Sequence, residues 1–301
     1  MTRARGDRPF VDRPVADRAA AARAAEQMAV VWGLGRPRLL RHGMNSLYAA
    51  DGVVLRVGAA TAPAATSQAL VGWLLDAGVP TVPPVEGLAA DIDGLAVTGW
   101  QLVRETRQAI DWHTVGRAVR LVHALDPADV PLGYPIPCPT SFSWWRFDDM
   151  LADVADDVDA TALAGLRAAV DRNRGWQDRV AAERRLCHGD VHPGNVLTTA
   201  AGPLLVDWDL MCVANPAWDH AMLASYAERW GGDAHTYAAF CEGYGPPPVA
   251  DMLVRQLGEL RNVAATLMRV RAGRHDPAAR AEAQHRLAYW RGDSDAPWRA
   301  Q

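Results

Sequence analysis

The stretch of sequence that decides the fold runs from Cys187 to Asp209 and reads CHGDVHPGNVLTTAAGPLLVDWD. Its two apolar runs, VLT and LLV, flank the turn-forming triplet AAG, so we predict a β-hairpin over residues 196–206. Antiparallel pairing places Asn195, just before the first strand, beside Asp207, just after the second. An amide oxygen and a carboxylate that converge in this way suit a hard divalent cation, which prefers oxygen ligands.

A further carboxylate precedes this hairpin. Asp190 lies five residues before Asn195, on a loop constrained by glycine and proline that can hold its side chain next to the cation. We therefore predict one carboxylate near a substrate hydroxyl and two oxygen ligands on a metal. Protein kinases transfer phosphoryl groups with such a set: a loop Asp accepts the hydroxyl proton, and an Asn and a second Asp bind Mg²⁺.

The spacing of these residues resembles that of a known family. The pattern HGDxHPGN at 188–195, followed by DWD at 207–209, is similar to the signature of the aminoglycoside phosphotransferase and choline kinase-like family. The segments GRAVRLVHAL at 116–125 and NPAWD at 215–219 also resemble segments of that family. The resemblance spans most of residues 37–270.

The pattern of apolar residues elsewhere in the chain predicts two lobes. The dipeptide Asp51-Gly52 between two apolar runs predicts a two-residue hairpin, and helical periodicity takes over after about Arg104. With the family resemblance, this implies an α+β, bilobal, protein-kinase-like fold. We expect a nucleotide-binding lobe with a small antiparallel sheet over residues 1–103, which includes an N-terminal tail and helix. A larger, mainly helical catalytic and substrate-binding lobe is expected over residues 104–301.

Two apolar stripes at helical spacing predict helices with one buried face. The first consists of Val115, Ala118, Leu121, Val122 and Leu125. The second consists of Leu253, Leu257, Leu260, Ala264 and Leu267. The second stripe suits either the core or a partner-binding face, and we favour the core because it is too short for a sustained coiled coil.

The resemblance implies a role for each matching residue. Asp190 would be the catalytic base that accepts the proton of the acceptor hydroxyl, or at least orients that hydroxyl. Asn195 and Asp207 would bind the Mg²⁺ ions that bridge the nucleotide phosphates. Arg56 would reach the α- and β-phosphates. His188 would brace the loop at residues 188–195 that carries Asp190, which we call the catalytic loop.

The resemblance also implies where the nucleotide, ATP or alternatively GTP, is bound. The residues implied to contact it, besides Arg56, are Gly43, Asn45, Ser46, Trp100 and Leu102. The family commonly pairs its basic residue with a Glu on the first-lobe helix, where this chain has Ser67 and Gln68. We expect Arg56 to be held by Gln68, by another carboxylate, or loosely.

Three further residues are interpreted as supporting the site. His192 is interpreted as a loop histidine satisfied by the backbone, and Asp219 as a residue that braces the loop or the start of a helix. Asp209 suits either substrate binding or stabilisation of the loop, and the sequence does not choose between them.

A rival reading of the same histidines is a metal-dependent hydrolase. His188, Asp190 and His192, with the dipeptide Asp219-His220, could form a dinuclear cluster, because His and Asp are normal ligands of zinc or manganese. That cluster would leave the paired Asn195 and Asp207 unexplained. A catalytically inactive nucleotide-binding relative is a third reading.

An acidic run and an aromatic group precede the catalytic loop. The acidic residues are Asp148, Asp149, Asp153, Asp156, Asp157 and Asp159. They indicate either a solvated helix face, which we favour, or an electrostatic funnel for a cationic substrate, with Asp148 and Asp149 as candidate contacts. The aromatic residues are Phe142, Trp144, Trp145 and Phe147. They indicate a core anchor or, alternatively, a substrate-stacking wall that includes Trp145.

The composition excludes several function classes. Half of the 301 residues are hydrophobic and 22% are charged, which favours a sizeable core. All 31 basic residues other than histidine are arginine, so Schiff-base chemistry on a lysine and a Walker A loop are excluded. A net charge of −4 argues against a nucleic-acid partner.

The sequence also supports predictions about location and partners. No apolar run approaches the length of a membrane span, and the four widely spaced cysteines are typical of reduced thiols in a cytoplasm. We therefore expect a cytoplasmic monomer or weak dimer whose partner is a small-molecule hydroxyl acceptor. Aminoglycosides and other antibiotics, amino sugars, choline-like alcohols and homoserine-like metabolites all suit the family, and the acidic run favours a cationic acceptor. An antibiotic-resistance role is one reading.

Overall fold

The computed structural model describes residues 17–59 and 61–299, and the predicted N-terminal tail lies outside them. The chain divides into two compact units, each built from discontinuous segments. The first unit comprises Met1–Asp111, Ala124–Pro137 and Pro193–Asp209. The second comprises Trp112–His123, Cys138–His192 and Leu210–Gln301. The linear division at residue 103 stays a prediction.

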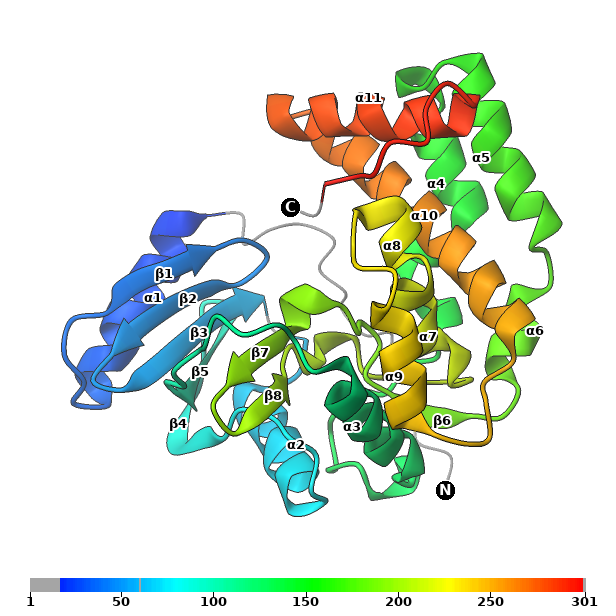
Figure 1. Cartoon of the computed structure of the whole chain (residues 1–301). Coiled ribbons are helices and arrows are strands. Elements are labelled where there is room, and N and C mark those ends of the chain that lie inside the picture. Colours follow the sequence, from blue (N-terminus) through cyan, green and yellow to red (C-terminus); the bar gives the residue numbers. More distant parts are fainter. Residues whose placement is uncertain (1–16, 60, 300–301) are drawn as a thin grey trace. The chain divides into compact units, whose positions relative to one another are not determined.

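The first unit contains a five-stranded antiparallel sheet with the strand order β1-β2-β3-β5-β4 (Figure 1). Its strands are β1 (Arg38–His42), β2 (Ser46–Ala50), β3 (Val53–Ala59), β4 (Pro84–Ile92) and β5 (Leu95–Gln101). Its helices are α1 (Arg18–Val31) and α2 (Ala64–Asp76). A separate hairpin is formed by β7 (Val196–Thr199) and β8 (Gly202–Leu205).

The hairpin between β2 and β3 turns at Asp51 and Gly52, as predicted. Both residues have positive φ, +47° and +79°, which is the conformation that a two-residue turn of this kind requires. The turn sets the register so that Val53, Leu55 and Val57 share the face of β3 that packs against the alanines of α1. Arg56 projects from the opposite face.

The second unit is mainly helical, with a single two-stranded ladder of β6 (Arg185–Cys187) and β9 (Cys212–Ala214) within its described residues. Its helices are α3 (Trp112–Ala124), α4 (Phe147–Asp153), α5 (Ala160–Arg172), α6 (Trp176–Ala181), α7 (Ala217–Ala224), α8 (Tyr226–Trp230), α9 (Thr236–Tyr244), α10 (Asp251–Gly273) and α11 (Pro277–Arg291). The predicted α+β class is thus confirmed. Short 3₁₀ segments lie at Pro127–Asp129, Pro139–Ser141, Ser143–Trp145, Ala155–Asp157, Pro193–Asn195 and Trp208–Leu210.

Helix α10 forms the centre of the second unit. All five members of its predicted stripe are buried, and the helix packs against α7, α11 and α5, so the core interpretation is confirmed. The stripe on α3 is narrower than predicted. Val115, Ala118 and Val122 are buried, but Leu121 is 42% exposed because it lies at the edge of the apolar face.

The aromatic group before the catalytic loop is part of the core. Trp145 is 4% exposed, and its ring lies 4.4 Å from that of Trp218 and 4.9 Å from that of Trp176. Aromatic pairs at such separations contribute more than their area alone. A ring enclosed in this way presents no face to a ligand, which corrects the prediction of Trp145 as a substrate contact.

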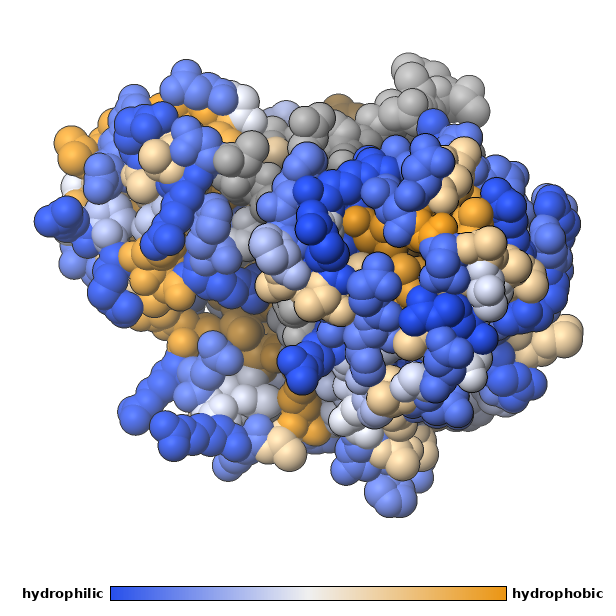
Figure 2. Space-filling model, turned by 90° about the horizontal axis from the view of Figure 1, so that it is seen from above, coloured by the Kyte–Doolittle hydropathy of each residue, from blue (hydrophilic) through white to orange (hydrophobic). Residues whose placement is uncertain are grey.

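Hydrophilic residues predominate on the face shown in Figure 2, where hydrophobic residues emerge only in small groups. The large hydrophobic side chains that are exposed in the described residues are scattered over several elements, as in other folded proteins. No helix within residues 17–59 and 61–299 is both long and apolar enough to cross a membrane.

A buried histidine, His220 on α7, packs edge-on against the rings of Tyr237, Phe240 and Tyr244. Burial and the neighbouring His123 lower its pKa to about 4, although Asp219 opposes the shift. The unfolded chain therefore binds the proton more tightly than the folded chain does. Neutral His220 favours the folded state above about pH 6.5, and this contribution is lost as the pH falls toward 4.

We predict that the free energy of unfolding decreases between pH 7.5 and pH 5, and that His220 accounts for about 2 kcal/mol of this decrease. The replacement His220→Gln should reduce the slope of unfolding free energy against pH. The measurement is urea unfolding at several pH values for both proteins. Equal slopes would show that His220 does not titrate in this range.

Candidate functional site

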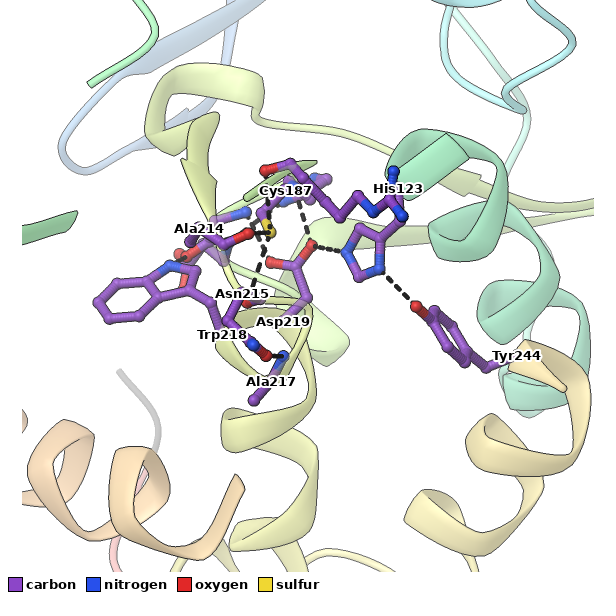
Figure 3. A network of polar contacts seen from close by, with 12 residues as sticks. His123, Cys187, Ala214, Asn215, Ala217, Trp218, Asp219 and Tyr244 are labelled. Carbon is purple, nitrogen blue, oxygen red and sulfur yellow. Dashed lines mark hydrogen bonds and ion pairs between the residues drawn. The ribbon is translucent and has the colours of Figure 1, made fainter. Parts of the chain in front are cut away.

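The catalytic loop that follows β6 in the second unit is held by one buried carboxylate, that of Asp219 on α7. Its Oδ2 accepts the backbone N–H of His188 at 2.8 Å, and its Oδ1 accepts the backbone N–H of Gly189 at 2.8 Å (Figure 3). His188 also braces the loop as expected, because its Nδ1 lies 3.3 Å from the backbone N of Asp190. The backbone on both sides of Gly189 is thereby fixed.

Asp219 is itself fixed by a histidine from α3. His123 Nε2 lies 3.0 Å from Oδ2, and His123 Nδ1 lies 2.8 Å from the hydroxyl of Tyr244 (Figure 3). Burial opposes ionisation of Asp219, but the His123 contact, the charge of His188 and the Gly189 N–H outweigh it and lower the pKa of the carboxyl. An ionised carboxylate that already accepts these bonds is a brace rather than a metal ligand.

The metal-hydrolase reading gains no support from this geometry. The group of three possible ligands found in residues 17–59 and 61–299 is His123, Cys187 and Asp219, not the predicted cluster. Burial raises the pKa of the Cys187 thiol well above its ordinary value, and the thiol faces the carbonyl of Ala214. A neutral thiol is a poor ligand, since metals bind the thiolate.

Glycine is required at position 189 by both conformation and space. Gly189 has φ of +95°, and a Cβ there would lie 1.9 Å from the carbonyl oxygen of Leu210. The turn that leads into Asp190 therefore depends on the absence of a side chain at Gly189.

We predict that Gly189→Ala lowers the free energy of unfolding by more than the about 1–3 kcal/mol expected of backbone strain alone. The matched control is Gly202→Ala in the β7–β8 hairpin, where φ is +118° but no atom lies within 4 Å of an added Cβ. Thermal or urea unfolding of the two variants makes the comparison. Equal losses would mean that the loop adapts to the added methyl group.

The carboxylate of Asp190 lies between two basic side chains. His192 Nε2 is 3.4 Å from Oδ2, and Arg261 Nη1 on α10 is 3.3 Å from Oδ1. Burial opposes ionisation, but His192, then Arg261 and His188, outweigh it, so the pKa of Asp190 lies well below its ordinary value. Asp190 is therefore ionised across the physiological pH range.

Arg261 is a residue of this site that sequence reasoning missed. It follows Leu257 by four residues, so it extends the buried face of α10 where an apolar residue is the normal choice. An arginine on such a face needs a hydrogen-bonding or charged partner. That need was the one signal in the sequence that could have identified Arg261 as a functional residue. The identity of that partner depends on how α10 packs, which the sequence does not show.

In the first unit, the β7–β8 hairpin forms as predicted, with Val196 opposite Leu205. The backbone N–H of Val206 donates to the carbonyl of Asn195 at 3.0 Å, so the pairing continues to the residues just outside the strands. Asp207 follows with φ of +66°, an uncommon conformation that persists where the surroundings require it. The amide of Asn195 and the carboxylate of Asp207 are the oxygen donors that suit Mg²⁺.

Arg56 on β3 meets the acidic residues that follow this hairpin. Its Nη2 donates to Oδ2 of Asp209 and lies 3.4 Å from Oδ1 of Asp207. Burial would lower the pKa of Arg56, but the two carboxylates, with Asp209 first, raise it above the ordinary value. Another carboxylate thus holds Arg56, as one of the sequence alternatives proposed.

Gln68 on α2 has a different task. Its Nε2 donates to the carbonyls of Gly99 and Leu88, at 2.8 and 3.0 Å, and the side chain is buried. These bonds attach α2 to the sheet and leave the amide N–H groups fully used. The resemblance implied a Glu at the position of Ser67 or Gln68, and Gln68 instead attaches α2 to the sheet in this chain.

The predicted nucleotide contacts all lie in the first unit, but not all are accessible. Ser46 is completely buried and its Oγ lies 2.8 Å from His42 Nδ1, and its place in the loop over the nucleotide stays a prediction. The amide oxygen of Asn45 lies against Gly58, where a Cβ would be 1.9 Å away. The loop at Gly43 is thus anchored on β3.

The two remaining contacts lie at the end of β5. Leu102 is exposed, and its backbone N–H donates to the carbonyl of Gly52 at 2.8 Å. Trp100 Nε1 donates to Thr98 at 2.8 Å. The role of both residues in adenine binding stays a prediction.

Much of the acidic run is neutralised by arginines in the second unit. Arg274 pairs with Asp153 and Asp157, at 3.2 and 2.8 Å, and Arg291 pairs with Asp159 at 2.8 Å. These carboxylates link α4 and α5 to α10 and α11. Asp148 and Asp149 are exposed, and their proposed role in substrate binding stays a prediction.

The model of the phosphotransferase enzyme family matches residues 73–257, which is more than half of the chain. No curated protein sequence matches this chain. A spectinomycin phosphotransferase, solved with ADP and spectinomycin, is similar in structure with a TM-score of 0.69. It has 16% sequence identity, with 89% of this chain and 94% of that chain covered.

Two further solved structures are similar. A thermostable mutant of an aminoglycoside phosphotransferase gives a TM-score of 0.62 at 19% identity, with 89% of this chain and 98% of that chain covered. A choline/ethanolamine kinase family protein from Mesorhizobium loti gives 0.60 at 20% identity, with 87% and 89% covered. At these identities the structures establish a common fold.

Proposed function

We propose that this chain, which belongs to the phosphotransferase enzyme family, is an ATP-dependent small-molecule phosphotransferase that acts on a hydroxyl group, and that Asp190, Asn195, Asp207 and Arg56 carry the reaction. The observation that supports this assignment most strongly is the meeting of Arg56 with Asp207 and Asp209 in the first unit. The residue predicted to bind phosphate and the residue predicted to bind metal are neighbours there, although 151 residues separate them.

We propose that Asn195 and Asp207 hold Mg²⁺, which would neutralise charge on the nucleotide phosphates. Arg56 would donate to phosphate oxygens with the planar fork of its guanidinium, while Asp209 keeps that fork in place. The carboxylates of Asp207 and Asp209 follow the β7–β8 hairpin, and the guanidinium of Arg56 projects from β3 of the sheet. Positioning and charge neutralisation are the main sources of rate in this class of reaction.

In the proposed step, the acceptor oxygen forms a bond to the γ-phosphorus while the bond from that phosphorus to the bridging oxygen of ADP breaks. Asp190 orients the acceptor hydroxyl and receives its proton. A carboxylate with a lowered pKa is a weak base, so orientation is the larger part of its contribution and the proton moves late.

For the acceptor, we propose an aminoglycoside-like molecule, which would make the enzyme antibiotic-modifying. The alternatives are an amino sugar, a choline-like alcohol or a homoserine-like metabolite. Support for a cationic acceptor now depends on the exposed Asp148 and Asp149, because the carboxylates of Asp153, Asp157 and Asp159 are paired with arginines. A cytoplasmic location, GTP as an alternative nucleotide and a monomer or weak dimer belong to the same proposal.

We predict that Asp190→Asn stays folded and lowers phosphoryl transfer by at least about a hundredfold, because the hydroxyl loses its orienting base. The assay is ADP release from Mg-ATP with a panel of aminoglycosides, amino sugars, choline and homoserine, which also identifies the acceptor. Asp171→Ala, at an exposed carboxylate of α5, serves as a surface control. A near-normal rate in Asp190→Asn would remove this residue from the mechanism.

We predict that Asp207→Ala abolishes the Mg²⁺-dependent part of nucleotide binding, since one of the two proposed oxygen ligands is lost. Calorimetry with ADP, in the presence and absence of Mg²⁺, measures that part directly in both proteins. The retained pair between Arg56 and Asp209 should preserve the metal-independent part. A variant that still responds to Mg²⁺ as the parent does would place the metal at other residues.

A further inference from the structure

We propose that Arg261 of α10 is a positioning residue for phosphoryl transfer, one that holds the carboxylate of Asp190 in the orientation that receives the acceptor hydroxyl. This inference rests on the proposed function, because it assumes that Asp190 acts on that hydroxyl. Neither the sequence pattern nor the family resemblance assigned any role to this arginine.

The contacts of Arg261 fall on two successive residues of the loop. Its Nη1 donates to Oδ1 of Asp190 at 3.3 Å, and its Nη2 donates to the carbonyl of Gly189 at 2.6 Å. The two donors of one planar group therefore fix a side chain and the peptide bond before it together. A lysine could not match this geometry, since its ammonium is a single point of charge.

The arginine is held as firmly as the loop that it contacts. Its guanidinium lies 5.1 Å from the ring centre of Trp218, whose own Nε1 donates to the same Gly189 carbonyl at 3.2 Å. The side chain is 13% exposed, and the neighbouring Leu257 and Leu260 are buried in the core. Few rotamers remain open to Arg261, so it transmits the position of α10 to Asp190.

Arg261 is a cation at every physiological pH, because a guanidinium is not deprotonated in proteins. His192 and His188, which lie on the same loop as Asp190, also act on its carboxylate. Asp219 of α7 accepts the backbone N–H of Gly189, and His123 of α3 lies against the carboxylate of Asp219. A guanidinium beside a carboxylate favours the ionised form at every physiological pH, whichever state the histidines adopt.

The experiment compares Arg261→Ala, Arg261→Lys and the control Arg255→Ala. Arg255 lies on the same helix and pairs with Asp251, but both side chains are mostly exposed. The assay is hydrolysis of Mg-ATP, in which water replaces the acceptor. We expect kcat of Arg261→Ala to fall by at least about tenfold with KM for Mg-ATP unchanged, since a misplaced catalytic group costs rate. Arg261→Lys should fall between Arg261→Ala and the parent.

Chemical rescue separates positioning from a purely structural role. Guanidinium ion at millimolar concentration should restore part of the lost kcat in Arg261→Ala, whereas urea, which is neutral and of similar shape, should not. In an Asp190→Asn background, Arg261→Ala should cause no further loss, because the group that it positions is absent. Thermal unfolding of each variant reports on the fold independently.

Several results would overturn the inference. One is a kcat of Arg261→Ala within twofold of the parent, and another is equal restoration by urea and guanidinium. A third is a loss that persists undiminished in the Asp190→Asn background. If Asp190→Asn itself retains normal hydrolysis, the proposed function of Asp190 fails first, and that outcome is distinct from a failure confined to Arg261.

Discussion

The second unit depends on one buried carboxylate, that of Asp219, whose hydrogen bonds join segments far apart in the sequence. Asp219 is completely buried and accepts two successive backbone N–H groups of the catalytic loop and the imidazole of His123. A buried charge without such partners would cost several kcal/mol, so the ionised form and the loop conformation stabilise each other. Because β6, α3 and α7 all contribute to this group, the loop is fixed by the packing of the whole unit.

The peptide bond after Gly189 shows how this constraint reaches the chemistry. Its carbonyl is bound by Trp218 and Arg261, and its N–H, that of Asp190, lies 3.3 Å from Nδ1 of His188. Asp219 binds the N–H of Gly189 itself, in the preceding peptide bond. Asp190 therefore begins from a backbone with little freedom, and its carboxylate is flanked by Arg261 and His192. The arrangement keeps the carboxylate ionised, at the cost of making it a weaker base.

In the first unit, the distribution of charge differs from the pattern common in the family. The helix position that usually supplies a Glu holds Gln68, which is bonded to the sheet, and Asp209 takes over as the partner of Arg56. The partner thus comes from the segment that also carries the proposed metal ligand Asp207. The contact between Arg56, proposed to bind phosphate, and the segment proposed to bind metal uses no side chain of α2.

The two hairpins and the buried face of α10 could be predicted from the chain alone, whereas the roles of Asp190, Asn195 and Asp207 stay predictions. Turn chemistry, hydrophobic period and residue spacing are local properties, and each was visible within a short window. The burial of Ser46 and the identity of the partners of Arg56, Asp219 and Arg261 could not be predicted. Each of these features depends on contacts between residues that are distant in sequence. Only the packing of helices and strands determines which of the many possible neighbours come together.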